Sequence, residues 1–350
     1  MNRVSSLLRR AAHHTLSLVA TAYGGVLLLL SLLWAIAAER HWLIAVTNIF
    51  APLLFIPLLL LIPAALLLRS RPLRGATVLA LLIALAAVGP YLTPTFAAPP
   101  AGRPLRIATF NLWQSNPDLV ATLLAARDQD ADIIAFQELT HDAAAIIRAQ
   151  LSDMYPYQHL TPTSSHAGLG VISRYPIVAQ PAGFRAPGQQ LLIDVDGQPL
   201  TFVNVHLAAP RYLQRSYATA WYVPPLAAYS SATRDTQMDR FLTAIESIHG
   251  PLVVAGDFNT SDREPRYQQL ATTLHDAYRA TSWGFGFTFP NNKVMLGVPI
   301  PFPLVRIDYV WTRDAIAPVD TRIVCDHTSD HCMLVADLVL FAPYNEVQND

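Results

Sequence analysis

Residues 252–262 read LVVAGDFNTSD. The apolar run 252–255 predicts a buried strand, and Gly256 then frees the backbone where that strand ends. Alternation along a strand places Asp257 and Asn259 on one side and Phe258 on the other. A carboxylate and a carboxamide would then point at one substrate atom, while Phe258 anchors the turn. The alternative is a turn that merely ends a strand, so the rest of the chain must decide.

The 350-residue chain averages two parts of unlike composition. Residues 1–96 hold seven arginines and one acid, Glu39, whereas the remainder holds 17 basic and 24 acidic residues, a net charge of −7. That remainder contains a single lysine, Lys293. Nonspecific binding of a nucleic-acid duplex needs clustered Lys and Arg. Nucleic acid is therefore a less favoured substrate of this part of the chain.

The first hundred residues predict a membrane region of about three helices. Residues 16–38 and 43–68 are uncharged and long enough to cross a bilayer, which takes about 20 residues. Residues 76–92 are weaker and need Gly89 and Pro90 to reach spanning length. Prolines inside the second stretch are tolerated in a membrane helix, because neighbouring groups satisfy the freed carbonyls.

The arginines predict an orientation, since short cytoplasmic loops carry an excess of positive charge. Arginines 3, 9 and 10 precede the first stretch, and arginines 69, 71 and 74 follow the second. The N-terminus should be cytoplasmic, and with three spans the C-terminal domain lies outside the cytoplasm, anchored in the plasma or inner membrane. A cleavable signal over residues 1–38 is the alternative, but its apolar run exceeds the usual length. Cleavage would still leave the later helices as a hairpin.

We expect a transmembrane region over residues 1–92, a proline-rich linker over 93–103, a catalytic domain over 104–342 and a tail over 343–350. The linker would hold the domain within roughly 30 to 40 Å of the bilayer. Such a tether makes lipids and other envelope molecules natural substrates.

Polar residues recur at or beside predicted strands of the domain: Asn111, Glu138, His206, Asp257, Asn259, Asp308, Asp330 and His331. Each has an ordinary structural alternative, such as a solvated strand end or a core histidine. Asp308 lies in an apolar strand, where an unpaired carboxylate is costly, and an aspartate that orients an imidazole would pair it with His331.

Cys325 and Cys332 flank the Thr328 to His331 turn, and either a disulfide or two free thiols fits this spacing. Two apolar loops, residues 210–233 and 283–304, either line a substrate pocket, touch the membrane interface or pack on their own domain.

Seven blocks follow one another in order: TFNL, FQEL, SRYPI, VNVHL, GDFN, RIDYVW and SDH. In these blocks residues 104–342 resemble the endonuclease/exonuclease/phosphatase family of deoxyribonuclease-I-like, metal-dependent phosphoesterases. The resemblance implies an α/β (α+β) fold, a four-layer sandwich of two mostly antiparallel sheets flanked by helices. The chain departs from many DNA-repair members at Trp113, where those carry an acidic residue, and this weakens a repair-endonuclease interpretation.

The resemblance also implies roles for the residues. Glu138 looks like the main ligand of Mg²⁺ or Mn²⁺, with Asn111 and Asp330 close to the metal. Asp257 would orient or deprotonate the attacking water, and Asn259 and His206 would bind phosphoryl oxygens. His331, positioned by Asp308, would stabilise the transition state or act as the acid-base partner, and the sequence leaves open which residue is the base.

These observations favour a membrane-anchored hydrolase of phosphodiesters, with a lipid or envelope molecule as substrate. An extracellular nuclease is the second enzyme hypothesis, and it predicts DNA cleavage that weakens steeply with salt. A non-catalytic sensor or binding module on the same fold is the third, although such a module has no need of Glu138, Asp257, Asp308 and His331 together.

Overall fold

A computed structural model of the chain describes residues 3–37, 41–68, 70–93, 100–184, 186–211, 229–295, 298–326 and 328–341. Two compact units make up the chain, a mainly N-terminal helical unit, to which the described residues up to Thr93 and Arg263–Pro265 belong, and a C-terminal unit of strands and helices. The predicted tail, residues 94–99 of the predicted linker and residues 212–228 of the first apolar loop lie outside the described residues.

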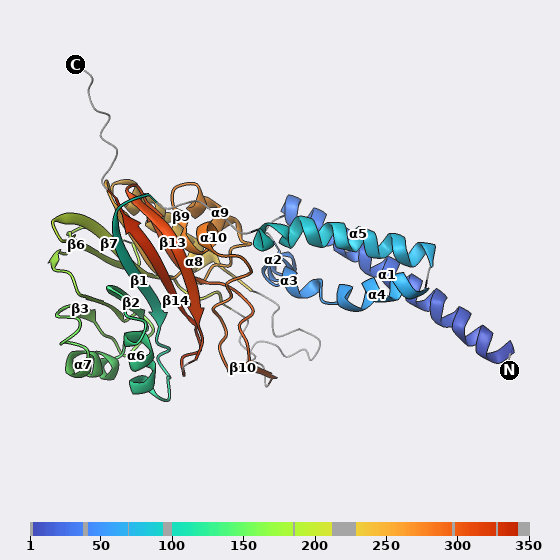
Figure 1. Cartoon of the computed structure of the whole chain (residues 1–350), viewed down its shortest axis with the longest axis horizontal. Helices are drawn as coiled ribbons and strands as arrows, with labels where there is room; N and C mark the ends of the chain where they lie inside the picture. The colour runs from blue at the N-terminus through green and yellow to red at the C-terminus, as the bar shows by residue number, and fades with distance from the viewer. Residues whose placement is uncertain are drawn as a thin grey trace, which may run out of the picture. The chain divides into compact units, whose positions relative to one another are not determined.

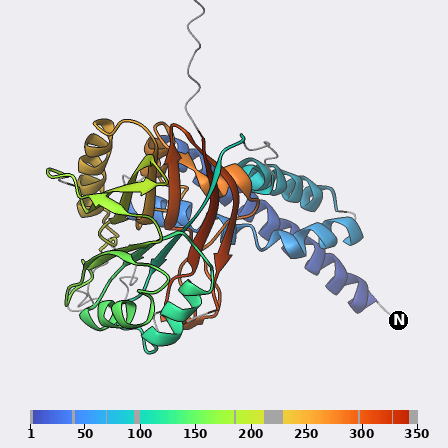
Figure 2. The ribbon, with the colours of Figure 1, turned by 60° about the vertical axis from the view of Figure 1, so that its left-hand side comes forward.

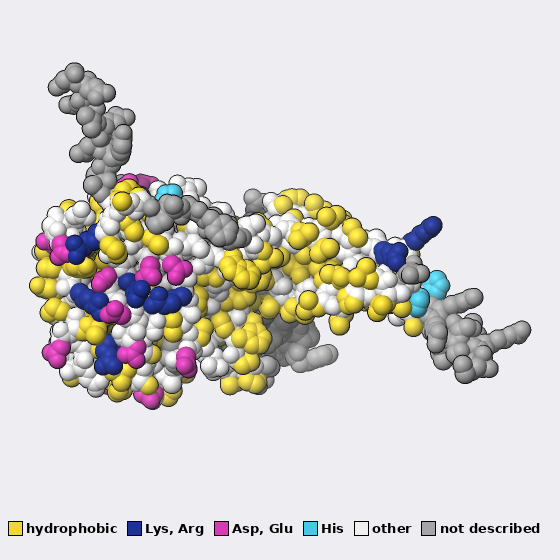
Figure 3. Space-filling model, viewed as in Figure 1, with side chains coloured by type: hydrophobic (Ala, Val, Ile, Leu, Met, Phe, Trp, Pro, Cys, Tyr) yellow, Lys and Arg dark blue, Asp and Glu magenta, His cyan; other side chains and the backbone are white. Residues whose placement is uncertain are grey.

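The N-terminal unit confirms the prediction of about three apolar helices. The segments long and apolar enough to cross a membrane are Ala11–Ala37, Ala51–Leu68 and Arg71–Leu92. Their outward leucines, such as Leu60 and Leu67, are 77% and 80% exposed, which suits hydrocarbon rather than water. Figure 3 shows hydrophobic side chains across the visible face of these helices. The helices are α1 (Arg3–Ala37), α2 (Trp42–Ile49), α3 (Ala51–Leu54), α4 (Leu58–Leu68) and α5 (Arg71–Val88), with the 3₁₀ turn η1 (Gly89–Leu92).

The second and third predicted spans differ from the structure in detail. Residues 43–68 form three pieces instead of one helix, because Pro52 in the first turn of α3 and Pro57 before α4 have no backbone N–H to continue the hydrogen-bond ladder. Pro63, in contrast, lies inside α4. The third helix begins at Arg71, five residues before the predicted start, with Ser70 at its N-cap and a proline in its first turn.

The C-terminal unit contains two six-stranded sheets and a separate two-stranded one. The first large sheet has the order β13 (Ile316–Val324), β14 (Met333–Leu340), β1 (Arg103–Asn111), β2 (Ile133–Gln137), β4 (Leu169–Ser173), β3 (Tyr157–Thr161). The second has the order β5 (Ile177–Ala179), β6 (Gly188–Val195), β7 (Gln198–His206), β8 (Leu252–Asp257), β12 (Asp308–Arg313), β9 (His275–Asp276). The small sheet pairs β10 (Lys293–Met295) with β11 (Val298–Ile300).

Each large sheet contains one parallel pair, and a helix makes the connection in each. The helix α6 (Leu119–Arg127) joins β1 to β2, and α8 (Ala232–Glu246) lies between β7 and β8 in the chain. Parallel neighbours need such a crossover, whereas the other, antiparallel pairs do not. The remaining helices are α7 (His141–Gln150), α9 (Pro265–Ala271) and α10 (Ala277–Thr281).

Apolar side chains define four layers. Ile107 and Ile133 of the first sheet pack in one buried cluster with Phe202 and Val253 of the second, so this core lies between the sheets. The outer face of the first sheet packs on α6 and α7, and that of the second on α8 and α9. In Figure 2 the green helices and the gold helix α8 lie on opposite sides of the strands, and Figure 1 labels these elements. The predicted four-layer sandwich is confirmed.

Both faces of β8 are covered, which explains why its sequence is a continuous apolar run. Phe258, just after the strand, is fully buried and meets Phe241 and Tyr309 edge to face at 5.7 Å. Burial of such a ring contributes about 2 to 3 kcal/mol. Phe258 thus anchors the turn whose other side chains form the site.

A buried polar network joins the two sheets. The amide of Asn204 in β7 donates to the carbonyls of Phe136 and Gly170 in the first sheet, each at 3.0 Å, and accepts from Gln137 at 2.8 Å. Because unsatisfied buried amides are costly, these bonds favour one alignment of the sheets. Gln137 is the residue before Glu138, so the network lies next to the candidate site.

Candidate active site

Strand register aligns the predicted residues of the second sheet. His206 pairs with Asp257 across the parallel β7 and β8, and Asp308 pairs with Asp257 across the antiparallel β8 and β12. Three of the predicted site residues, His206, Asp257 and Asp308, therefore occupy one row on adjacent strands. In the first sheet Asn111 pairs with Gln137, which puts Glu138 at the same strand end as Asn111.

Asp257 lies at the centre of this arrangement and is 1% exposed. Its Oδ2 atom accepts from the Nδ2 atoms of Asn111 at 3.0 Å and Asn259 at 3.2 Å, and its Oδ1 atom accepts from the Asn259 backbone N–H at 2.8 Å. The residue before it, Gly256, has φ 151°, and a Cβ there would lie 2.0 Å from the carbonyl oxygen of Val205. Only glycine fits this close approach of β7 and β8.

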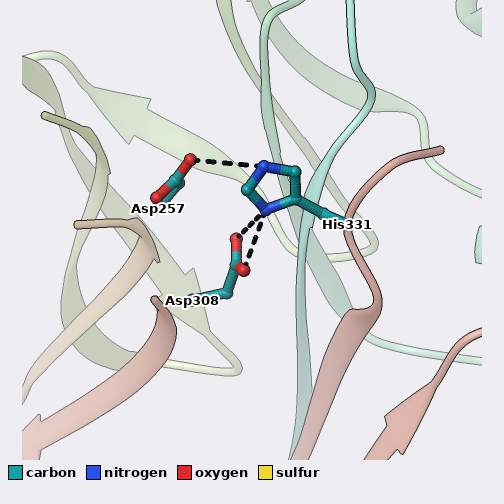
Figure 4. Close-up of side chains that lie close together, drawn as sticks. All are labelled: Asp257, Asp308 and His331. Atoms are coloured by element: carbon teal, nitrogen blue, oxygen red, sulfur yellow. Dashed lines mark hydrogen bonds and ion pairs between the residues drawn. The ribbon is translucent and has the colours of Figure 1, made fainter. Parts of the chain in front are cut away.

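Asp308 and His331 form a pair that faces Asp257 (Figure 4). The Nδ1 atom of His331 lies 3.0 Å from Oδ2 of Asp308, and its Nε2 atom lies 3.8 Å from Oδ2 of Asp257. Both residues of the pair are buried. A carboxylate that accepts from Nδ1–H fixes the tautomer and orientation of the ring, so Nε2 is the atom directed into the site.

The turn that carries His331 is fastened to its surroundings. Cys325 and Cys332 are joined by a disulfide that encloses this turn. Ser329, 1% exposed, donates from its hydroxyl to the carbonyl of Asn111 at 2.7 Å and accepts from the backbone N–H of His331 at 3.1 Å. These contacts attach the turn to the end of β1.

Asp330, 4% exposed, has both oxygens near other site groups. Its Oδ2 atom pairs with the ammonium of Lys293, and its Oδ1 atom lies 4.0 Å from Nε2 of His331. The structure therefore places Asp330 beside His331 and adds a lysine to which the sequence pattern gave no role.

Glu138 has φ 53°, a strained backbone conformation for this residue. Its Oε2 atom accepts from the backbone N–H of Gln114 at 2.7 Å and pairs with Nδ1 of His166 at 3.0 Å. In the described part of the chain its Oε1 atom accepts no hydrogen bond. The carboxylate thus retains one oxygen for a cation.

His206 and Asn259 surround Asp257 on the side of β7. The carbonyl of His166 accepts from Nδ1 of His206 at 2.9 Å, and Nε2 of His206 lies 3.6 Å from Oδ2 of Asp257. Asn259, with φ 48°, donates from Nδ2 to the carbonyl of Leu207 at 2.9 Å as well as to Asp257. Both amide hydrogens of Asn259 are therefore engaged in orienting the turn and Asp257.

Burial and charge set the protonation of these groups. Burial and the Asp308 carboxylate raise the pKa of Asp257 to about 8, against the opposing effect of His331. Burial alone would lower the pKa of His331, but the carboxylates of Asp308 and Asp257 raise it to about 10.

The pKa values of His206 and Glu138 are shifted downward. Burial lowers the pKa of His206, which favours the neutral ring. Burial opposes ionisation of Glu138, yet the hydrogen bonds from Gln114 and His166 keep its pKa below the ordinary glutamate value. An ionised carboxylate, a neutral imidazole and a protonated imidazole thus coexist near neutral pH.

Two places in the site fit a divalent cation. Asp257, Asp308 and His331 bring three ligand atoms within 4.8 Å of one another and could hold an ion. An ion there would compete with the His331 to Asp308 hydrogen bond. Glu138 offers an ionised, partly free carboxylate, and hard oxygen donors of this kind suit Mg²⁺ or Mn²⁺.

Sequence reasoning missed three contributors to the site: Gln114, His166 and Lys293. Gln114 acts through its backbone N–H, which no side-chain pattern reports. His166 lies in a loop without periodicity and reaches Glu138 across 28 residues of chain. One sequence feature could have indicated Lys293, because it is the single lysine in an acidic domain.

Comparison with known proteins agrees with this geometry. The sequence model of the Endonuclease/Exonuclease/phosphatase family matches residues 108–331. No curated protein matches the chain.

Solved structures share the fold at low identity. A family protein from Bacteroides thetaiotaomicron has TM-score 0.51 and 15% identity, over 69% of this chain and 100% of its own. A family protein from Bacteroides vulgatus has TM-score 0.50 and 19% identity, over 68% and 100%. A humanized D. rerio TDP2 with 14 mutations has TM-score 0.51 and 16% identity, over 67% and 98%. These likenesses show a shared fold.

Proposed function

The chain belongs to the endonuclease/exonuclease/phosphatase family, and we propose that it is a membrane-anchored, divalent-metal-dependent phosphodiesterase whose substrate is a lipid or another envelope molecule. The observation that carries this proposal is the convergence of the His331–Asp308 pair on Asp257. Hydrolysis of a phosphodiester requires a group that orients or deprotonates the attacking water and a group that stabilises or protonates the departing oxygen.

Asp257 is the proposed base. Three hydrogen bonds from Asn111 and Asn259 fix its carboxylate. The carboxylate is therefore already in position to orient a water molecule. Its pKa of about 8 makes the ionised form a stronger base than an exposed aspartate, and the ionised fraction increases as the pH rises toward this value. In this scheme Asn259 positions Asp257.

His331 is the proposed proton donor. Its raised pKa keeps the ring protonated near neutral pH, and Nε2–H is directed into the site. The imidazolium would stabilise charge on the phosphoryl oxygens or donate its proton to the departing oxygen as the bond to phosphorus breaks. Asp308 holds the ring and compensates its charge.

His206 contributes in a different way from that expected. Its Nδ1–H is given to the His166 carbonyl, so the neutral ring has a lone pair at Nε2. It becomes a donor to a phosphoryl oxygen only when it is protonated, and the arrival of a negative phosphate favours that protonation.

Glu138 would hold Mg²⁺ or Mn²⁺, with Asn111 and Asp330 nearby. When bound, the cation would withdraw charge from a phosphoryl oxygen and help to position the substrate. Glu138 is prepared for this role, because its lowered pKa keeps it ionised and its Oε1 atom is not engaged by the described residues.

The predicted location of the C-terminal domain at a membrane supports a lipid or another envelope molecule as the substrate. Three helices are long and apolar enough to cross a membrane, and the arginine distribution predicts that the catalytic domain lies outside the cytoplasm. The disulfide between Cys325 and Cys332 is consistent with an oxidising compartment. An enzyme held at a bilayer meets lipid phosphodiesters at high local concentration.

The test uses the full-length chain, purified in detergent and screened with Mg²⁺ or Mn²⁺ against phospholipids, nucleotides, DNA and bis(p-nitrophenyl) phosphate. We expect hydrolysis of at least one phosphodiester, and a loss of about 100-fold or more in Glu138→Gln and Asp257→Asn.

Glu246→Gln and Asp320→Asn, both exposed, are the matched controls and should retain activity. A wild-type chain inert on every substrate would refute the proposal. Salt-sensitive cleavage of DNA alone would favour a nuclease, and ligand binding unaffected by chelator and by Glu138→Gln would favour a non-catalytic module.

A further inference from the structure

Lys293 is the single lysine of the chain, and it reaches the candidate active site from outside the two large sheets. It begins β10 of the small two-stranded sheet, and its ammonium pairs with Asp330, the residue before His331. Its side chain is 32% exposed. A charged group of this kind is held in place yet remains open to a ligand.

Two aromatic rings flank the ammonium. The Nζ atom lies 5.4 Å from the ring centroid of Trp113 and 5.4 Å from that of Phe289. The Phe289 ring in turn packs on His331, with centroids 4.8 Å apart. These rings attract a cation and limit where it can move. We call Lys293, Trp113 and Phe289 the lysine subsite.

The backbone of Trp113 is held in place by a hydrogen bond to the side chain of Asn111. Its φ is 60°, and its backbone N–H donates to Oδ1 of Asn111 at 3.0 Å, the same side chain whose Nδ2 atom donates to Asp257. The lysine subsite is thus linked to Asp257 and Asp308 through its contacts with Asn111 and His331. Phe289 and Lys293 lie four residues apart in the chain, and Trp113 joins them from a distant segment.

The negative charge of the surrounding carboxylates favours a positively charged side chain where the phosphate binds. The carboxylates of Glu138, Asp308 and Asp330 and the carboxyl group of Asp257 surround the position where a negative phosphate must bind. His331 compensates Asp308, with which it pairs. Lys293 offers a second positive charge, and an ammonium has three N–H donors, of which Asp330 needs one.

We propose that Lys293 binds an anionic oxygen of the scissile phosphodiester, with Trp113 and Phe289 keeping the ammonium beside His331. This inference rests on the proposed function, because it adds a substrate-binding residue to the same site. It adds the positive charge of a side chain of the protein to that of the proposed divalent cation.

The experiment compares Lys293→Met, which keeps the aliphatic stem without the charge, with Lys293→Arg, which keeps the charge. Full-length protein in detergent is assayed for kcat and KM on bis(p-nitrophenyl) phosphate. Its affinity for inorganic phosphate is measured separately by calorimetry, which requires no turnover. Thermal unfolding of each variant reports whether the fold is retained.

Loss of one charge-assisted contact should raise KM and weaken phosphate binding about tenfold or more in Lys293→Met, with a smaller change in kcat. Lys293→Arg should stay within about threefold of the wild type, since the charge remains. Trp113→Leu should weaken phosphate binding by about threefold through loss of the cation–π contact.

Unchanged KM and phosphate affinity in Lys293→Met would overturn the inference. Equal losses in Lys293→Met and Lys293→Arg would also overturn it, because they would indicate a packing role. If Lys293→Met fails to fold, unchanged phosphate affinity in Trp113→Leu overturns it instead. If the wild type binds phosphate through Lys293 but hydrolyses nothing, the proposed function fails while the subsite stands.

Discussion

Single residues of the site are held in conformations that the rest of the fold must stabilise. Trp113, Glu138 and Asn259 all have positive φ, and each either carries a predicted function or contacts a residue that does. Such strain costs on the order of 1 to 3 kcal/mol per residue and persists only where the surroundings enforce it. The hydrogen bonds to Glu138 and the buried Phe258 beside Asn259 supply that enforcement.

The charge of His331 depends on Asp308, which gives a first prediction. Burial lowers the pKa of His331, and the carboxylates of Asp308, Asp257 and Asp330 together more than offset it, so Asp308→Asn should lower this pKa. If His331 acts as the protonated group, the alkaline limb of kcat/KM against pH should move to lower pH by about one unit or more.

The same profile should be unchanged in Asp320→Asn, which removes an exposed carboxylate of β13. An alkaline limb that stays in place in Asp308→Asn would show that this limb belongs to another group.

Gly256 gives a second prediction. A methyl group there would lie 2.0 Å from the Val205 carbonyl oxygen, so Gly256→Ala should force β7 and β8 apart and reduce the free energy of unfolding by about 3 kcal/mol or more. Gly250→Ala is the matched control. Gly250 also has positive φ, 80°, but open space around it, so only about 1 kcal/mol of backbone strain is expected.

Denaturant unfolding of the two variants in detergent measures the difference. Equal losses would mean that backbone conformation, and not the close approach to Val205, requires glycine at position 256.

Among the elements, the turn between β13 and β14 is the one most dependent on added constraints. Its disulfide closes a loop with a sequence separation of 7, for which chain entropy predicts about 2 kcal/mol of stabilisation. The turn carries Ser329, Asp330 and His331. Loosening it should therefore affect the site more than the sheets.

This leads to a third prediction, for the double variant Cys325→Ala/Cys332→Ala. We expect a fall of about 2 kcal/mol in the free energy of unfolding and a loss of kcat larger than the change in KM. Reduction of the wild type with dithiothreitol should reproduce the loss of kcat and leave the double variant unaffected. A reduced wild type with full activity would contradict this role of the disulfide.

The elements also show how far sequence alone could go. The strands that end in Asn111, His206 and Asp257 were predictable, because apolar alternation locates strands and their polar ends. The seven ordered motifs implied the four-layer fold, which periodicity alone does not give.

Other features depend on contacts that leave no local pattern. The engagement of both Asn259 hydrogens, the Gln114 backbone donor and the pairing of His166 with Glu138 all arise from segments that meet only in the folded chain. The sequence could not predict the break between α2 and α4 either, because proline is compatible with both a continuous and an interrupted membrane helix.

For the whole molecule, charge is divided between the two parts of the chain. The arginine-rich N-terminal part and the acidic remainder predict a cytoplasmic N-terminus and an external catalytic domain. The proposed anchoring by several helices would keep the domain at its membrane and restrict it to substrates of that surface.

The fourth prediction tests this orientation. Alkaline phosphatase fused after Asp350 should be active, because that enzyme requires an oxidising compartment, whereas a fluorescent protein that folds only in the cytoplasm should remain dark at the same position. Fusions after Ser70, in the second loop, should give the reverse pattern. An active cytoplasmic reporter after Asp350 would refute the three-span arrangement.

The single lysine has a practical consequence. Reductive methylation with ¹³C-formaldehyde adds methyl groups to amines and retains their positive charge, so apart from the α-amino group it would label one side chain in the entire protein. The ring currents of Trp113 and Phe289 would shift that resonance away from the position of a free lysine. The chain thus contains its own spectroscopic reporter, placed beside the candidate catalytic histidine without any engineered substitution.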